Sequence, residues 1–328
     1  MRLSDTPLIT HLYAADPSAH VFEGKLYLYP SHDRETDQPD NDLGDQYDMV
    51  DYHVFSMDDV HGAITDHGVA LTLADVPWAA KQMWAPDAAF KNGRYYLYFP
   101  ARDHAGIFRI GVAVSDRPSG PFTAEPEPIK GSYSIDPCAF TDTDGRTYLC
   151  FGGLWGGQLQ SWRTGNFDAQ GREPVGAAPA LLPRIAELGP DMKSFTGPVR
   201  EIKILDEQGR LLRADDHERR FFEAAWLHKR EGIYYFSYST GNTHYLAYAT
   251  GDNPFGPFTY AGRLLEPVIG WTTHHSIIEF KGRWYLFHHD SSLSGGLNHL
   301  RCLKLKELVY DEAGRMKVLA PAASGCAV

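Results

Sequence analysis

A hairpin unit that occurs five times along the chain is the feature that most limits the possible folds. Each unit has an apolar strand, a polar turn that contains glycine, and an aromatic-rich strand. The five copies are AHVFEGKLYLYPS, AAFKNGRYYLYFPA, CAFTDTDGRTYLCFGG, AWLHKREGIYYFSYS and SIIEFKGRWYLFHHD. Glycine between such runs is a strong hairpin signal, because tight turns need positive φ angles that glycine adopts freely. We therefore predict five β-hairpins.

The spacing of these hairpins favours a closed ring of sheets. Their turn glycines are separated by 69, 52, 87 and 50 residues, which suits sheets of about four strands arranged radially. The segments IGVAVSDRPSGPF and YLAYATGDNPFGPF share a pattern and extend the second and fourth units. We predict an all-β, five-bladed β-propeller that forms a single domain over residues 1–328, with LPRIAELGPDMKSFTGPVREIKILDEQGRLL as an insertion between units three and four. A sandwich or a barrel is the alternative.

Composition and charge exclude several classes of protein. With 43% hydrophobic and 13% aromatic residues, the chain can build a substantial core. Its formal net charge of −11 argues against binding to nucleic acid or anionic membranes, which require a basic surface. No apolar run approaches the roughly 18 residues of a membrane helix, and the N-terminal stretch lacks the apolar region of a signal peptide. We expect a cytoplasmic protein whose four scattered cysteines are free thiols, namely Cys138, Cys150, Cys302 and Cys326.

Polar residues occupy the first strand of each unit at similar distances from the turn glycine. Asp16 and His274 lie eight residues before it, Asp136 and Glu223 lie nine residues before it, and Asp87 lies six before it. The first strand of each propeller blade lines the central axis, so residues at one offset converge on one region. Because a carboxylate inside a strand is costly unless it is paired or functional, we predict a shared central pocket.

Carboxyl groups that face each other across a pocket are suited to glycoside hydrolysis, in which one protonates the leaving oxygen and another attacks or activates water. Glu223 is predicted as the general acid, because the apolar residues of FFEAAW around it disfavour its anion. Asp16 is predicted as the base, and Asp136 as the residue that orients Glu223 and keeps it protonated. Taken singly, the two Asp-Pro pairs can mark turns, and Glu223 can belong to a solvated amphipathic helix.

The motifs YAADPSAHVF, MWAPDAAFKNGRYYLYF, SIDPCAF, FFEAAWLHKREGIYYFSYS and THHSIIEFKGRWYLFHHD together resemble glycoside hydrolase family 43. The resemblance covers nearly the whole chain. It implies a five-bladed propeller with an inverting mechanism, and it assigns Asp16 as base, Asp136 as the residue that orients and tunes the acid, and Glu223 as acid. In such an enzyme the acid and the base stand about 6.5–9.5 Å apart.

The resemblance also implies a metal ion near the axis, often calcium, with His274 as its ligand and water completing the shell. A single histidine is unusual for calcium, so another divalent ion is an alternative, as is a histidine that holds only water. Arg301 in NHLRCLKL resembles a sugar-contacting arginine, for which surface pairing is the alternative. Trp84 and Asp87 in MWAPD resemble residues near the sugar, although Asp87 can instead hold neighbouring blades together.

Four tryptophans are candidates for stacking on a sugar face, namely Trp84, Trp155, Trp226 and Trp271, with packing in the core as the alternative for each. The pair His288-His289 is expected to pack or to form hydrogen bonds rather than to hold a second metal ion. The chain ends soon after the fifth unit, so we expect no C-terminal β-sandwich.

These observations predict an exo-acting xylan 1,4-β-xylosidase that releases D-xylose from the non-reducing ends of β-1,4-xylo-oligosaccharides with inversion. The alternative within the class is an α-L-arabinofuranosidase or an enzyme with both activities. A non-catalytic sugar-binding propeller is the alternative from another class. A sialidase is disfavoured, because TDTDGRTY places aspartate directly before glycine, unlike the Asp-box repeat.

Overall fold

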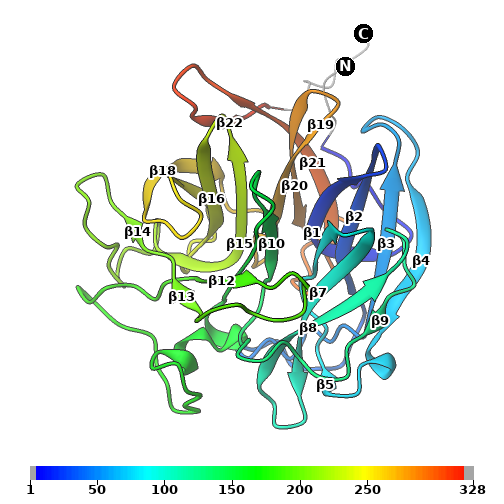
Figure 1. Ribbon diagram of the computed structural model, residues 1–328, viewed down its shortest axis with the longest axis horizontal. Helices are drawn as coiled ribbons and strands as arrows, with labels where there is room; N and C mark the ends of the chain where they lie inside the picture. Colours follow the sequence, from blue (N-terminus) through cyan, green and yellow to red (C-terminus); the bar gives the residue numbers. More distant parts are fainter. Residues whose placement is uncertain (1–4, 321–328) are drawn as a thin grey trace.

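The computed structural model describes residues 5–320 and arranges their strands as five sheets around a common centre (Figure 1). Blade one contains β1 (Tyr13–Phe22), β2 (Lys25–Asp33), β3 (Asp51–Met57) and β4 (Thr65–Thr72). Blade two contains β6 (Asp87–Lys91), β7 (Arg94–Asp103), β8 (Phe108–Ser115) and β9 (Thr123–Ala124), with β5 (Ala79–Lys81) paired to the far end of β7. The predicted five-bladed β-propeller is thus confirmed.

The other three blades repeat this four-stranded plan. Blade three contains β10 (Cys138–Thr141), β11 (Thr147–Phe151), β12 (Arg184–Leu188) and β13 (Arg200–Glu201). Blade four contains β15 (Phe221–Arg230), β16 (Ile233–Thr240), β17 (Leu246–Gly251) and β18 (Phe258–Leu265), to which β14 (Ile204–Leu205) adds in parallel. Blade five contains β19 (His275–Phe280), β20 (Arg283–Asp290), β21 (Cys302–Tyr310) and β22 (Met316–Val318).

Each of the five predicted hairpins forms the inner pair of one blade. The pairs are β1–β2, β6–β7, β10–β11, β15–β16 and β19–β20, all antiparallel. At the first turn, Glu23 and Gly24 have φ angles of 52° and 76°, and two successive positive values are typical of the tightest hairpin turns. The turn chemistry of the sequence therefore determines the register of the inner strands.

The segment predicted as an insertion between units three and four belongs to the blades themselves. It contains β12, β13 and β14, which supply the outer strands of blade three and an extra strand on blade four. The sequence did not reveal this, because the strands β13 and β14 are only two residues long and carry no alternating pattern. Helix is confined to three short 3₁₀ segments within the described residues, η1 (Leu73–Asp75), η2 (Trp155–Gly157) and η3 (Leu159–Trp162).

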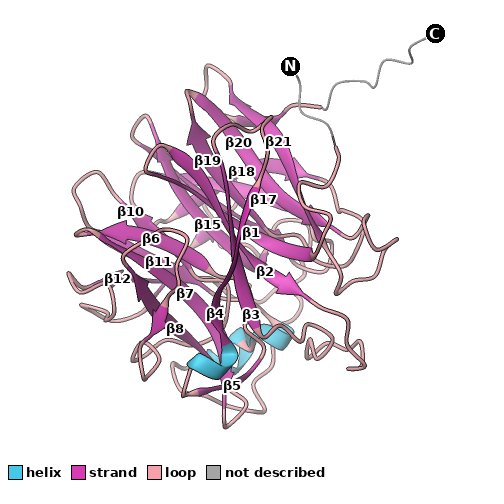
Figure 2. Ribbon diagram, turned by 90° about the vertical axis from the view of Figure 1, so that its right-hand side faces the viewer, coloured by secondary structure: helices cyan, strands magenta, loops and turns pink. Residues whose placement is uncertain are grey.

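The ring closes where blade five meets blade one. The backbone N–H of Leu8 donates to the carbonyl oxygen of Leu303, and the N–H of Ala14 donates to that of Arg301, both at 2.9 Å. Apolar side chains of β1, β2, β20 and β21 pack together at this junction. The strands of the ring run side by side, and the short helical segments lie near β5 at one end of the sheets (Figure 2).

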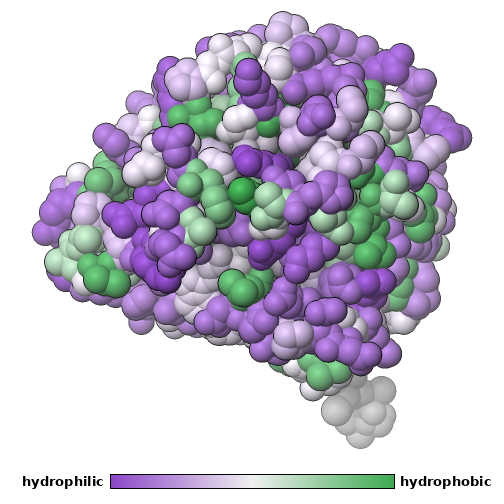
Figure 3. All heavy atoms as spheres, turned by 90° about the horizontal axis from the view of Figure 1, so that it is seen from below, coloured by the Kyte–Doolittle hydropathy of each residue, from purple (hydrophilic) through white to green (hydrophobic). Residues whose placement is uncertain are grey.

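The surface agrees with the acidic, polar composition. On the face seen in Figure 3, hydrophilic residues predominate and apolar ones occur in small separate groups. In residues 5–320, no helix is long and apolar enough to span a membrane. Cys138, Cys150 and Cys302 are buried free thiols, whereas Cys326 lies outside the described residues.

Candidate active site at the propeller axis

The backbone departs from regular strand geometry at each of the three predicted acids. The β1–β2 register shifts between Ala15 and Ser18, and Asp16 within that shift has a φ of 51°. The β15–β16 register shifts after Glu223, where the next residue, Ala224, has a φ of 62°. Asp136, just before β10, has a φ of 56°. Such bulges and strained residues re-aim side chains and cluster at functional sites, and here they turn carboxyl groups from three blades toward the axis.

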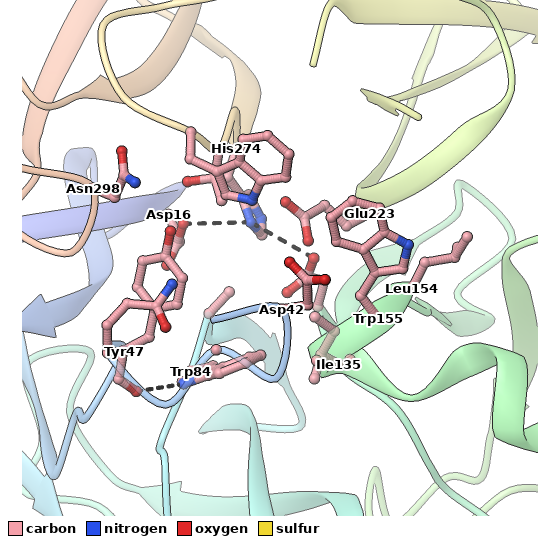
Figure 4. A pocket seen from close by; sticks show the side chains of 18 of the residues that line it. Asp16, Asp42, Tyr47, Trp84, Ile135, Leu154, Trp155, Glu223, His274 and Asn298 are labelled. Atoms are coloured by element: carbon pink, nitrogen blue, oxygen red, sulfur yellow. Dashed lines mark hydrogen bonds and ion pairs between the residues drawn. The ribbon is translucent and has the colours of Figure 1, made fainter. Parts of the chain in front are cut away.

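The three acids share one cavity of about 280 Å³ with His274 (Figure 4). Its walls come from all five blades, and loops between strands contribute most of the lining. The lining residues are Asp16, Asp40, Asn41, Asp42, Gly44, Gln46, Tyr47, Met49, Trp84, Ala85, Ile135, Asp136, Leu154, Trp155, Gly156, Gly157, Phe222, Glu223, Trp271, Thr272, His274, Asn298 and Arg301. The shared offset in the sequence thus placed Asp16, Asp136, Glu223 and His274 correctly in one pocket.

Asp16 is held as a carboxylate. Burial by itself would raise its pKa, but the guanidinium of Arg301, whose Nη1 lies 2.9 Å from Oδ1, lowers that pKa well below its usual value. The hydroxyl of Ser31 donates to Oδ2 at 2.7 Å. The backbone N–H of Asp16 donates to Nδ1 of His289 at 3.0 Å, and Nε2 of that imidazole lies 3.0 Å from the carbonyl oxygen of Thr272. As expected, His289 forms hydrogen bonds.

Arg301 links Asp16 to a second buried carboxylate, Asp33. Its Nε and Nη2 donate to the two oxygens of Asp33 at 2.8 Å, and its backbone N–H donates to Oδ2 at 2.9 Å. Bidentate pairing of this kind fixes the guanidinium plane. The sequence predicted Arg301 as a sugar contact. The structure places it in the pocket lining, where its guanidinium contacts Asp16, the predicted base.

Burial raises the pKa of both Glu223 and Asp136, and it raises that of Glu223 the more. Glu223 is half-buried at the pocket wall and is surrounded by protein atoms, so desolvation raises its pKa well above the usual value, and the negative charges of Asp136 and Asp16 raise it further. Desolvation also raises the pKa of Asp136 to about 6, opposed by His274. The N–H of Ala224 donates to Oδ2 of Asp136 at 2.8 Å, which ties Asp136 to the residue next to Glu223.

His274 lies close to two of the acids, and Figure 4 shows it beside Asp16. Its Nδ1 is 3.7 Å from Oδ1 of Asp16 and 3.9 Å from Oδ2 of Asp136, distances at which a water molecule often bridges polar groups. Within residues 5–320, the ligand atoms of His274, Asp16 and Asp136 do not form a group in which all three lie within 4.8 Å of one another. Since calcium takes six to eight oxygen ligands, His274 fits a hydrated divalent ion with one protein ligand and not a cage built from protein oxygens.

Aromatic side chains form two sides of the pocket. On one side, Nε1 of Trp84 donates to the carbonyl oxygen of Tyr47 at 2.7 Å, which fixes the indole against the loop between β2 and β3. On the other side, the rings of Trp155 and Trp271 stack at 5.7 Å with an interplanar angle of 23°. Trp271 is 38% exposed. The pocket therefore offers apolar ring faces beside its carboxyl groups, an arrangement suited to sugars.

The structure places two of the predicted substrate-binding residues outside the pocket lining. Asp87 is 1% exposed and lies outside the pocket lining. It accepts hydrogen bonds from Ser18 of blade one and from the backbone N–H of Ala139 of blade three, so it holds blades together, as the alternative interpretation stated. Trp226 is also buried outside the lining, and its Nε1 donates to the carbonyl oxygen of Ile277 in blade five at 3.1 Å. Both residues face a neighbouring blade because strand positions alternate between faces.

Sequence reasoning missed several residues of the site. Asp33 is the last residue of β2, and Tyr47 lies in the long polar loop that follows it. This loop has no periodicity that could indicate which of its side chains turn inward. Asn298 reaches across the rim from blade five, where its Nδ2 donates to Asp40 at 3.1 Å. Asp33 lies two residues after Ser31 on the same face of β2, and the contact of Ser31 with Asp16 became visible only in the structure.

Comparisons with known proteins agree with this geometry. The family model described as Glycosyl hydrolases family 43 matches residues 5–316. The chain is 66% identical to xylosidase/arabinosidase 43A of Humicola insolens, over 96% of this chain and 99% of that protein. It is 57% identical to a xylosidase/arabinosidase of Bacteroides ovatus, over 96% of this chain and 98% of that protein.

Among solved structures, the chain resembles a β-xylosidase/α-arabinofuranosidase of family 43 from a compost microbial metagenome, crystallised with xylotriose in a calcium-free form. The TM-score is 0.96 and the identity 61%, over 98% of this chain and 99% of that one.

Proposed function

The chain belongs to glycosyl hydrolases family 43, and from this premise we propose that it is an exo-acting β-xylosidase that hydrolyses β-1,4-xylo-oligosaccharides with inversion. One observation carries the proposal. A single pocket contains a carboxylate that is kept ionised, Asp16, and a carboxyl group that is kept protonated, Glu223. Two acids whose environments push their pKa values apart are the pair that glycoside hydrolysis requires.

In the proposed reaction, Asp16 takes a proton from a water molecule, whose oxygen forms a bond to the anomeric carbon of the terminal sugar. The bond from that carbon to the leaving oxygen breaks, and Glu223 gives its proton to the leaving oxygen. Arg301 keeps Asp16 charged and oriented before the reaction. Asp136 adds negative charge beside Glu223 and so keeps the acid protonated until the leaving oxygen needs the proton.

We also propose His274 as the ligand of a hydrated divalent ion, calcium being the candidate. The fit of one imidazole near two carboxylates supports the site, and the calcium-free form named for the similar structure supports the choice of ion. When bound, such an ion supplies positive charge at the base of the pocket beside Asp16 and Asp136.

The size and the rim of the pocket support cleavage of terminal sugars. A volume of about 280 Å³ lies at the small end of ligand pockets, which hold roughly 300–1,000 Å³, so it suits the end of a short oligosaccharide rather than a long stretch of polymer. The contact between Asp40 and Asn298 closes the rim on one side. Xylosides are the proposed substrates, and the names of the relatives support arabinofuranosides as a second substrate class.

Two assays test the proposal. Hydrolysis of 4-nitrophenyl β-D-xylopyranoside and of the corresponding α-L-arabinofuranoside by purified protein compares the two substrate classes. Negligible turnover of the xyloside beside rapid turnover of the arabinofuranoside would reverse the assignment. Proton NMR of xylobiose hydrolysis shows the first anomer formed, which for inversion of a β-xyloside is α-xylose. Initial release of β-xylose would refute the single displacement and the role of Asp16 as a base.

A further inference from the structure

Two imidazoles and a carboxylate lie together on blade one, outside the pocket. His32 is on β2, and Asp51 and His53 are on β3. Each offers one ligand atom, and these three atoms lie within 4.8 Å of one another. Their side chains are partly buried, with exposed fractions of 25% for His32, 18% for Asp51 and 15% for His53. Within residues 5–320, this is the one cluster of histidine, cysteine or acidic residues with ligand atoms so close.

The strand pairing accounts for the cluster. In the β2–β3 register, Leu28 lies opposite Phe55, and the same register continued along the pair sets His32 opposite Asp51. His53, two residues after Asp51, shares its face of the sheet. The neighbours of His32 in β2, Ser31 and Asp33, point the other way, where they contact Asp16 and Arg301. The cluster and the predicted catalytic base therefore lie on opposite faces of one strand.

Contacts around the cluster present the ligands in a suitable way. Nδ1 of His32 lies 2.6 Å from Oδ1 of Asp51. Nδ1 of His53 lies 3.1 Å from Oδ1 of Asp66, whose other oxygen lies 2.8 Å from Nε2 of His11. A carboxylate that accepts from one ring nitrogen of a histidine fixes the tautomer and leaves the other nitrogen for a metal ion. Asp66 is placed to do this for His53.

We propose that His32, Asp51 and His53 bind one divalent transition-metal ion, of which zinc is the representative. Two imidazoles and one carboxylate are ligands that zinc accepts in sites with three protein ligands and a water molecule. Calcium and magnesium prefer shells made of oxygen, so this site differs in chemistry from the one at His274. With zinc–ligand distances of about 2.0–2.1 Å and tetrahedral angles, the ligand atoms would lie about 3.3 Å apart. In the structure, the three ligand atoms lie within 4.8 Å of one another.

The position of the site gives the ion a structural task. His32 precedes and Asp51 follows the loop of residues 34–50, and this loop supplies seven residues of the pocket lining. These are Asp40, Asn41, Asp42, Gly44, Gln46, Tyr47 and Met49. An ion shared by His32 and Asp51 ties the two ends of the loop together. We therefore expect the bound ion to reduce the motion of one pocket wall.

Zinc binding to chelator-stripped full-length protein tests the proposal. Isothermal titration with ZnCl₂ and thermal unfolding with and without zinc are measured for the wild type and for His53→Gln, Asp51→Asn and Asp66→Asn. His61→Gln is the matched control, because His61 is exposed and lies outside the cluster. His274→Gln removes the candidate ligand of the axial ion. Hydrogen exchange of residues 34–50, measured with and without zinc, reports on the loop.

We expect one zinc ion per wild-type chain and a zinc-dependent rise in Tm that His61→Gln and His274→Gln retain. His53→Gln and Asp51→Asn abolish both effects, and Asp66→Asn weakens zinc binding about 10- to 100-fold. Zinc slows hydrogen exchange of residues 34–50 in the proteins with an intact cluster, namely the wild type, His61→Gln and His274→Gln. The site is refuted if the wild type shows no zinc-dependent shift, or if the cluster variants bind zinc as tightly as His61→Gln. If zinc binds but hydrogen exchange of residues 34–50 is not slower, the proposed effect of the ion on the loop is refuted.

Discussion

Replacing Asp33 with asparagine tests whether Arg301 holds the predicted base in place. Asp33 is buried, lies outside the pocket lining and accepts three hydrogen bonds from Arg301. Asparagine has nearly the same shape but only one acceptor oxygen. Its NH₂ group, which is a donor, therefore faces an N–H donor of the guanidinium, and that hydrogen bond is lost. Arg301 must then leave the orientation in which Nη1 meets Asp16 at 2.9 Å.

The structure sets the expected size of both effects. Removing one partner of a buried ion pair costs about 3–5 kcal/mol, and the remaining hydrogen bonds of asparagine place Asp33→Asn near the lower end of that range. A shift of about 1 Å in a reacting group lowers the rate about 100-fold, and we expect a loss of this order in kcat. Asp33 itself lies outside the pocket lining, so both effects act through Arg301, which belongs to that lining. Urea unfolding and steady-state kinetics on 4-nitrophenyl β-D-xylopyranoside measure both quantities.

Asp142→Asn is the matched control. Asp142 is also buried and paired, since Nζ of Lys229 lies 2.7 Å from its Oδ1, but it joins blades three and four away from the pocket. The substitution Asp142→Asn should lower the free energy of unfolding and leave the kcat of the folded protein unchanged. If Asp33→Asn keeps the wild-type kcat, or loses no more than Asp142→Asn, the argument for Arg301 as a positioning residue is wrong.

Three further results are expected. Glu223→Gln should lose about 10²–10⁴-fold in rate on xylobiose and much less on the nitrophenyl xyloside, whose leaving group needs little protonation; equal losses would contradict Glu223 as the acid. Asp136→Asn removes negative charge beside Glu223 and so lowers the pKa of that acid. Because Glu223 must be protonated, the alkaline limb of kcat/KM moves to lower pH, and a limb that stays in place would count against this coupling. EDTA should lower kcat, calcium should restore it, and His274→Gln should respond to neither; an unchanged rate in stripped wild type removes the axial ion from the mechanism.

The hairpins and the ring could be predicted because their signals are local. A glycine turn between alternating apolar strands specifies a hairpin wherever it occurs, and five such units determine the number of blades. Blade assembly also explains why Asp16, Asp136, Glu223 and His274 were found, since equivalent positions in repeated strands meet at one axis. Asp87 and Trp226 also lie in first strands, but their side chains contact an adjoining blade.

The amino-acid sequence by itself determined the repeat, the turns and the chemical types of the groups at the axis. Only the tertiary structure decided their ionisation and their partners. The guanidinium of Arg301, held by Asp33 from the opposite end of the chain, lowers the pKa of Asp16. Desolvation and the nearby charges of Asp136 and Asp16 raise the pKa of Glu223. Long-range electrostatics depends on distances in space, and separations along the sequence do not contain that information.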